Sequence, residues 1–162
     1  MTTIDIPAIL ARLYDKCDKP TGRYGCILWR GATYDGLYGK MRNPMSSLYD
    51  QPRYIRVHRL VYLLHNISDF KSLKLPREDS AGNPLDVSHI CHNSLCVNIS
   101  HLVLEPHYIN CSRKDCIRYG RCENHAPACL LGMLIGEINN SIQYYSIVNN
   151  LLTIAINISS FS

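Results

Sequence analysis

Apolar side chains recur at helical spacing near the start of the chain. The run consists of Ile6, Ile9, Leu10, Leu13 and Tyr14. This spacing places them on one face of a helix, and Asp5 before Pro7 is typical of a helix start. The pattern predicts a short amphipathic helix that packs on the body of the protein and is followed by a turn, within residues 1–22.

Shorter apolar runs follow, separated by Gly, Pro and Asp. Residues 26–29 (CILW), 36–42 (GLYGKMR) and 53–57 (RYIRV) favour short strands, and residues 58–66 (HRLVYLLHN) return to a helical pattern. Residues 67–87 are polar and contain Pro and Gly, as loops do. Taken in order, these segments predict an α+β fold that begins with a small antiparallel sheet and is rich in loops.

Positive charge is concentrated in the first half of the chain. The net charge of the whole chain is only +4, but residues 19–59 hold a clear basic surplus against two acidic side chains, Asp35 and Asp50. The basic side chains are Lys19, Arg23, Arg30, Lys40, Arg42, Arg53, Arg56 and Arg59. Such a surplus suits a polyanion such as nucleic acid, although an ordinary solvated basic face gives the same count.

Neither end of the chain predicts a targeting or membrane segment. The N-terminus has Asp5 early and lacks the uninterrupted apolar stretch of a signal peptide. The most apolar stretch of the tail, residues 146–161, is interrupted by Asn149, Asn150 and Asn157, which argues against a membrane span. We therefore expect a reducing, intracellular compartment, where clustered cysteines bind metal more often than they form disulfides.

Cysteine and histidine are dense between residues 88 and 129. One group has the spacing C-x4-C-x4-H and another has the spacing C-x5-C-x2-H-x3-C. The first consists of Cys91, Cys96 and His101, and the second of Cys116, Cys122, His125 and Cys129. The second group is a complete set of thiolate and imidazole donors, of the type and number that tetrahedral Zn²⁺ requires.

The first group needs a fourth ligand from elsewhere in the chain. Cys17 and Cys26 both lie upstream, and Cys26 is favoured because it belongs to a strand-like apolar run, from which its side chain can point inward. The alternative is a disulfide scaffold, which the eight cysteines of the chain allow. The missing signal peptide and the interleaved histidines favour two structural zinc ions.

Two further side chains near these groups have the chemistry of a hydrolytic site. His89 stands two residues before Cys91 and is a candidate general base, because the pKa of histidine lies near neutrality. Asn110 follows residues 102–106 (LVLEP), which are expected to form a strand before a helix. Its side-chain oxygen is a hard ligand suited to Mg²⁺. We therefore expect a base and a metal ligand on a zinc-bound strand–strand–helix unit.

The order of these motifs resembles one nuclease family. The sequence S-H-I-C-H-N-S-L-C-x-N-x-x-H-L, followed by an Asn and by the Cys-Cys-His-Cys group, resembles the His-Cys box homing endonucleases, a branch of the ββα-metal (His-Me finger) nucleases. The upstream segments GCILWRGATYDGLYGKMR and YIRVHRLVYLLHN are similar to the sheet and helix that precede the nuclease motif in this superfamily. The resemblance spans residues 24–129 and implies a sequence-specific DNA endonuclease that hydrolyses phosphodiester bonds.

The resemblance also implies a role for individual residues. His89 is the general base, Asn110 the ligand of one catalytic Mg²⁺ or Mn²⁺, and Arg53 the side chain that touches the scissile phosphate. The two zinc ions are held by Cys26, Cys91, Cys96 and His101 and by Cys116, Cys122, His125 and Cys129. The candidate DNA contacts of the first sheet, which fits the major groove as a β-ribbon, are Tyr38, Lys40, Arg42, Arg53 and Arg56.

The same resemblance implies how the whole chain is organised. Residues 1–129 form a single nuclease domain, with a DNA-binding sheet and helix in residues 23–66 and the zinc-bound ββα-metal motif in residues 88–129. A homodimer on double-stranded DNA is expected, because cutting both strands of a near-palindromic site requires two subunits. Residues 130–162 do not resemble the C-terminal arm of the family, and are either a dimerising tail or an unrelated extension.

Two expectations remain open at the level of sequence. In a eukaryotic cell a DNA endonuclease is expected in the nucleus. The alternative to an enzyme is a zinc-dependent DNA-binding module without catalysis, which has the same zinc ions and basic sheet but gives no role to His89 and Asn110.

Overall fold

The elements follow the predicted α+β order. The computed structural model describes residues 4–46, 52–66 and 74–131. In chain order these residues form α1 (Ile6–Tyr14), β1 (Thr33–Tyr34), β2 (Tyr38–Arg42), β3 (Tyr54–Arg56), α2 (Val57–Asn66), β4 (Leu85–His89), the short 3-10 helix η1 (Ile99–His101), β5 (Leu102–Pro106) and α3 (His107–Tyr119). The predicted tail from residue 132 onward lies outside the described residues.

The first half of the chain builds a small sheet between helices. Asp5 begins α1 as expected, because its carboxylate accepts a hydrogen bond from the Ala8 amide at 3.0 Å. Strands β1, β2 and β3 pair antiparallel in that order. The turn from β1 to β2 passes through Asp35 and Gly36, which both have positive φ. This left-handed backbone explains the Asp-Gly pair at the turn.

The predicted strand at residues 26–29 was wrong. These residues form single bridges with three different partners instead of one ladder: Cys26 with Thr21, Leu28 with Cys96, and Trp29 with Cys17. The segment is apolar because it lies between the N-terminal part and the later Cys/His region, and Trp29 is only 2% exposed. A buried connecting segment has the same apolar composition as a short strand.

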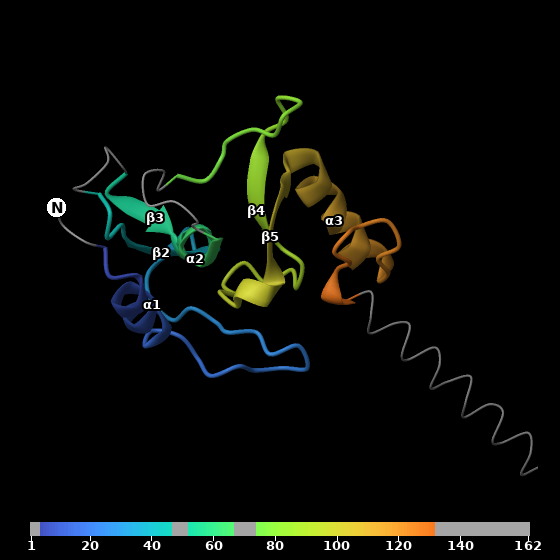
Figure 1. Cartoon of the computed structure of the whole chain (residues 1–162). Helices are drawn as coiled ribbons and strands as arrows, with labels where there is room; N and C mark the ends of the chain where they lie inside the picture. Colours follow the sequence, from blue (N-terminus) through green and yellow to red (C-terminus); the bar gives the residue numbers. More distant parts are fainter. Residues whose placement is uncertain (1–3, 47–51, 67–73, 132–162) are drawn as a thin grey trace, which may run out of the picture.

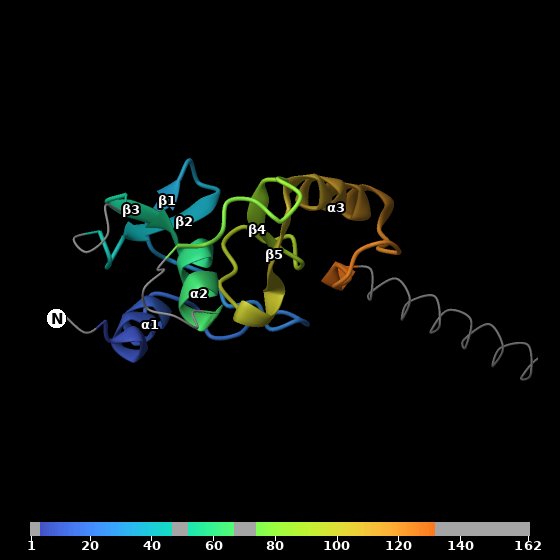
Figure 2. The same cartoon turned by 45° about the horizontal axis from the view of Figure 1, so that its top comes forward.

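The second half forms a hairpin followed by a helix. Strands β4 and β5 pair antiparallel from Leu85 opposite Pro106 to His89 opposite Leu102, and α3 packs against both strands. The predicted loop at residues 67–87 was therefore too long, because β4 begins at Leu85. Figures 1 and 2 show the hairpin and α3 on one side of the molecule, and α1, α2 and the first sheet on the other.

Helix α2 joins the two halves through one hydrophobic core. It contacts α1, β2 and β3 on one side and β4, η1 and β5 on the other. The buried members of the core are Ile9, Leu13, Trp29, Met45, Val57, Leu60, Val61, Leu63, Leu64, Val87, Val97 and Leu102. Both halves contribute, so the hairpin is held against the first sheet by apolar packing. Among the described helices, none has the length and hydropathy needed to cross a membrane.

Candidate active site and metal centres

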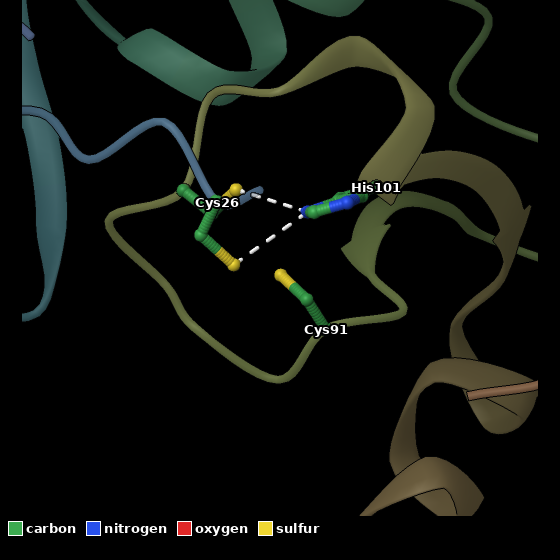
Figure 3. Close-up of side chains that lie close together, drawn as sticks. Cys26, Cys91 and His101 are labelled. Carbon is green, nitrogen blue, oxygen red and sulfur yellow. Dashed lines mark hydrogen bonds between the residues drawn. The ribbon is translucent and has the colours of Figure 1, made fainter. Parts of the chain in front are cut away.

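The first predicted zinc site is assembled from two distant segments. The ligand atoms of Cys26, Cys91, Cys96 and His101 all lie within 4.8 Å of one another. The Cys26 and Cys96 sulfurs are 3.6 and 3.4 Å from His101 Nδ1, and Figure 3 shows Cys26, Cys91 and His101 converging on one point. Cys17 is excluded from this cluster, because its thiol faces the Leu13 carbonyl at 3.4 Å. The fourth member is therefore Cys26.

The second predicted set is also brought together, at the C-terminal end of α3. The ligand atoms of Cys116, Cys122, His125 and Cys129 lie within 4.8 Å of one another. Helix α3 ends at Gly120, whose φ of 64° is the left-handed conformation that favours glycine at a helix end. The chain can therefore turn back at once and return three ligands to Cys116 on the last turns of the helix.

The chemistry of both clusters fits zinc. All eight cysteines lie within the described residues and are free thiols, so the structure forms none of the disulfides of the alternative scaffold. A hydrogen bond with Cys91 lowers the pKa of Cys96 to about 5. Burial opposes ionisation of Cys122, but hydrogen bonds from the Cys129 amide and from His125 lower its pKa to about 7. Each cluster thus offers three thiols and one imidazole, a donor set consistent with a structural zinc site without an open position. One thiol of each set ionises readily, whereas burial and hydrogen bonds between thiols raise the pKa of the other four cysteines, whose ionisation a bound cation would favour.

A buried charged network ties the second cluster to the hairpin. Arg113 on α3 donates to both carboxylate oxygens of Glu105 on β5, each at 2.7 Å. The same guanidinium donates to the Cys129 sulfur at 3.2 Å. Glu105 also accepts a hydrogen bond from the Ser88 hydroxyl, and Ser88 precedes His89. The position of the second metal centre is thereby linked to the strand that carries the predicted base.

His89 occupies the end of β4 with one ring nitrogen committed. Its Nε2 is 3.0 Å from the Cys96 carbonyl oxygen. Since a carbonyl only accepts, Nε2 carries the proton and Nδ1 keeps a free lone pair. Burial lowers the pKa of His89 to about 4, so the imidazole is neutral at pH 7. This is the geometry of a proton acceptor held in a single tautomer.

A second histidine packs against His89. The ring of His58, from the first turn of α2, has its centroid 4.7 Å from that of His89, and Tyr38 on β2 lies 5.3 Å from His58. His58 is only 4% exposed and its Nδ1 has no hydrogen-bond partner. Burial keeps the pKa of His58 well below its usual value. His89, on the hairpin, is therefore packed against rings that α2 and β2 supply from the first half of the fold.

Asn110, the predicted magnesium ligand, lies on α3 beside a carboxylate of β4. Its Nδ2 is 2.9 Å from Asp86 Oδ2, and the same oxygen is 2.7 Å from His107 Nδ1. Burial opposes ionisation of Asp86, but the hydrogen bonds with His107 and Asn110 lower its pKa. Amide and carboxylate oxygens are the hard donors that Mg²⁺ prefers, so the residues here fit that cation.

The predicted DNA contacts share the open face of the first sheet. Lys40 pairs with Arg56 and Arg42 with Tyr54 across β2 and β3, and directly opposed residues point to the same face. The Lys40 ammonium lies 4.9 Å from the Tyr34 ring and 4.6 Å from the Tyr54 ring. The result is a surface of alternating cations and aromatic rings on the sheet that was predicted to enter the major groove.

The arginines of this surface differ in their distance from the predicted base. Arg53 precedes β3 and lies over the Tyr54 ring at 5.6 Å. Arg56 lies over Tyr38, the ring next to His58, at 5.0 Å. Arg56 and Arg59 both act electrostatically on His58, and Arg59 also acts on Asp86. A ring contact of Arg56 and the electrostatic effects of Arg56 and Arg59 thus connect these two arginines, rather than Arg53, to the surroundings of His89.

Four residues of this region were missed by sequence reasoning: His58, Asp86, Glu105 and Arg113. His58 and Asp86 have partners far away along the chain; those of Asp86 stand 21 and 24 positions after it. Glu105 and Arg113 are 8 positions apart, on different elements. A charged residue within an apolar segment was the one available signal, since Glu105 stands in LVLEP. A buried charge needs a partner, but the sequence does not indicate which residue supplies it.

The comparisons with known proteins agree with this geometry. A family model described as the zinc-binding loop region of homing endonuclease matches residues 30–133. The match includes seven of the eight clustered ligands, all except Cys26, together with His58, His89 and Asn110. No curated protein and no solved structure shows a significant match to the chain.

Proposed function

We propose that this chain, which belongs to the homing endonuclease family with the His-Me finger zinc-binding loop, is a magnesium-dependent, sequence-specific DNA endonuclease. Membership of this family implies DNA endonuclease activity. The proposal adds three finer elements to this activity: a histidine general base, a magnesium ion and a pair of subunits.

The observation that carries the proposal is the state of His89. Its Nε2 is occupied by the Cys96 carbonyl, and Cys96 belongs to the first metal cluster. A zinc ion bound there fixes the loop that orients the imidazole, so Nδ1 is the nitrogen that can accept a proton. The non-catalytic DNA-binding module offers no reason for a neutral histidine to be held in this way.

The proposed reaction is hydrolysis of a phosphodiester bond. His89 Nδ1 accepts a proton from water as the water oxygen bonds to phosphorus. The bond from phosphorus to the 3′ oxygen breaks, and that oxygen takes a proton from solvent, leaving a 5′ phosphate and a 3′ hydroxyl. Asn110 would hold Mg²⁺, which supplies Lewis-acid stabilisation of the charge on the phosphate and the leaving oxygen.

Arginine side chains would stabilise the negative charge of the phosphate. The family resemblance assigns this contact to Arg53, whereas Arg56 and Arg59 are the arginines that act electrostatically on His58, the neighbour of His89. Replacing each of the three by alanine separates the two assignments. The arginine at the phosphate is the one whose loss lowers the cleavage rate more than it lowers DNA affinity.

DNA binding would use the open face of β1, β2 and β3. Lys40, Arg42 and Arg56 provide positive charge. Ring contacts with Tyr34 and Tyr54 hold Lys40, and one with Tyr38 holds Arg56. A two-stranded β-ribbon, which β2 and β3 would provide here, fits the major groove. Two subunits would be needed to cut both strands, and the tail proposed to pair them lies outside the described residues.

The test is cleavage of supercoiled plasmid carrying a library of inserts, with Mg²⁺ or with EDTA. We expect Mg²⁺-dependent linear product from the wild type, and a rate about 10²–10⁴-fold lower for His89→Ala. Cys17→Ser, outside both clusters, serves as the matched control. Equal DNA binding by both proteins without cutting by either would favour the non-catalytic module. Nicked circles alone would contradict the paired subunits but not the base.

A further inference from the structure

The amide of Asn110 has two chemically opposite ends, and only its oxygen can hold a cation. We propose that Asp86 is the positioning residue that selects this end, by holding the Asn110 amide nitrogen so that Oδ1 faces the magnesium ion. This inference rests on the proposed function and adds to it a residue of β4, the strand that ends at His89. Neither the family match nor the sequence motif assigns a role to Asp86.

A hydrogen bond between Asp86 and Asn110 fixes the orientation of the amide. Asp86 Oδ2 lies 2.9 Å from Asn110 Nδ2. A carboxylate is an acceptor only, so the group of Asn110 that faces it must be the N–H₂ donor. The flipped amide would bring two oxygen atoms to that distance and would be repelled. The planar amide then presents Oδ1 on its other branch, away from Asp86.

Asp86 is itself held in place by its strand and by His107. It lies in the β4–β5 ladder opposite Glu105, and its Oδ2 is also 2.7 Å from His107 Nδ1 on the first turn of α3. Two residues one helical turn apart, His107 and Asn110, therefore converge on one oxygen. A carboxylate fixed by a strand and bonded to a ligand is the usual outer partner that orients metal-binding side chains.

The negative charge of Asp86 lies close to arginine side chains. Arg59 acts electrostatically on Asp86 and is itself affected by Arg56. A negative group among arginines that face a phosphate opposes DNA binding, so a purely binding surface gains nothing from it. Beside a divalent cation the same carboxylate is favourable. The negative charge of Asp86 thus favours a cation at Asn110 and does not favour DNA on this face.

The experiment measures Mn²⁺ binding to the zinc-loaded protein on duplex DNA by electron paramagnetic resonance, and the Mg²⁺ concentration that gives half-maximal plasmid cleavage. Loss of an outer partner weakens metal binding about 10–100-fold. We expect this loss for Asp86→Ala in both measurements. Asp86→Asn should lose less, because its side-chain oxygen can still accept the Asn110 N–H. DNA affinity in EDTA should not fall for either variant.

Asp115→Ala is the matched control, since Asp115 is an exposed acid of α3 paired with Arg118. Zinc content of two ions per chain verifies that each variant is folded. If Asp86→Ala binds Mn²⁺ and responds to Mg²⁺ like Asp115→Ala while the wild type cleaves DNA, the positioning role is wrong and the nuclease stands. If the wild type neither cleaves nor binds Mn²⁺ beyond the DNA alone, the proposed function fails and the inference fails with it.

Discussion

Glu105 and Arg113 form an ion pair that is almost completely removed from water, with 5% and 2% of their surfaces exposed. Burying two charges is costly unless every donor and acceptor is used. Here the guanidinium also donates to the Pro127 carbonyl at 3.0 Å and to the Cys129 sulfur at 3.2 Å, and Ser88 donates to Glu105. The pair is therefore favourable only as a complete network that includes the second metal cluster.

We predict that Glu105→Ala lowers the free energy of unfolding by about 3–5 kcal/mol, because it leaves the Arg113 charge buried without its carboxylate. Urea unfolding of the zinc-loaded protein, followed by circular dichroism, measures the change. Asp115→Ala removes an exposed ion pair with Arg118 and should cost at most about 1 kcal/mol. Equal unfolding midpoints for the two variants would show that the network is not a significant source of stability.

His58 gives a second prediction, which concerns the site. Its ring fills the space between Tyr38 and His89, so His58→Ala frees the His89 ring to move. A displacement of about 1 Å can lower a rate about 10²-fold, and we expect a loss of this size in single-turnover cleavage with unchanged DNA affinity. His58→Phe keeps a ring in place and should retain more activity than the alanine variant. Alanine and phenylalanine variants of equal rate would contradict the packing role.

At the scale of elements, the first sheet and the Trp29 segment meet at Gly39. A β-carbon at this position would lie 2.8 Å from Trp29 Cδ1 and 3.1 Å from Val57 Cγ2. Trp29 is 2% exposed and Val57 is fully buried, so neither can move aside freely. Because glycine has no side chain at this position, α2 and Trp29 can approach the sheet closely.

We predict that Gly39→Ala lowers the free energy of unfolding by about 1–3 kcal/mol through overpacking. Arg42→Ala, at an exposed position of the open face of the same strand, should change it by no more than about 0.5 kcal/mol. Thermal unfolding of both zinc-loaded variants provides the comparison. A Gly39→Ala protein as stable as Arg42→Ala would mean that the Trp29 side chain can shift to accommodate the added methyl group at no cost.

The elements that were predicted correctly are those with a local signal. Helices α1 and α2 follow apolar periodicity, and β2 and β3 follow turn residues at their ends. The segment 26–29 was taken for a strand because burial by several partners and burial in a sheet give the same apolar run. The start of β4 at Leu85 was missed because the polar residues around it are typical of a loop, and only pairing with Pro106 makes it a strand.

The metal clusters were predictable for the same reason, since seven of their eight ligands lie within residues 91–129. The eighth, Cys26, was chosen from two candidates by its apolar surroundings, and the structure places it in the cluster. By contrast, His58 and Asp86 have ordinary local surroundings. They gain their importance from folding, which brings α2 and β4 to His89 and Asn110 respectively.

At the scale of the whole molecule, the two clusters close loops of very different length. The first joins Cys26 to His101, which are 75 residues apart, and so connects the segment before the first sheet to the hairpin. The second closes only the span from Cys116 to Cys129, at the end of α3. Both are Cys₃His sets, so their donor chemistry is equal and their contributions differ mainly in how much of the chain each one constrains.

We predict from this difference that losing the first zinc costs more stability than losing the second. Closing a longer loop removes more entropy from the unfolded chain, by about 1.5 kcal/mol for loops of these two lengths. Cys26→Ser and Cys122→Ser should each lower the zinc content measured by mass spectrometry from two ions to one per chain, and Cys17→Ser should retain both. Thermal unfolding should then rank Cys17→Ser as most stable, Cys122→Ser next and Cys26→Ser last.

The reverse order of the last two variants would mean that the second cluster, through the Arg113 network that contains Cys129, contributes more to the stability of the fold than the first. Two zinc ions retained by Cys26→Ser would exclude Cys26 as a ligand and remove the connection between the first sheet and the hairpin.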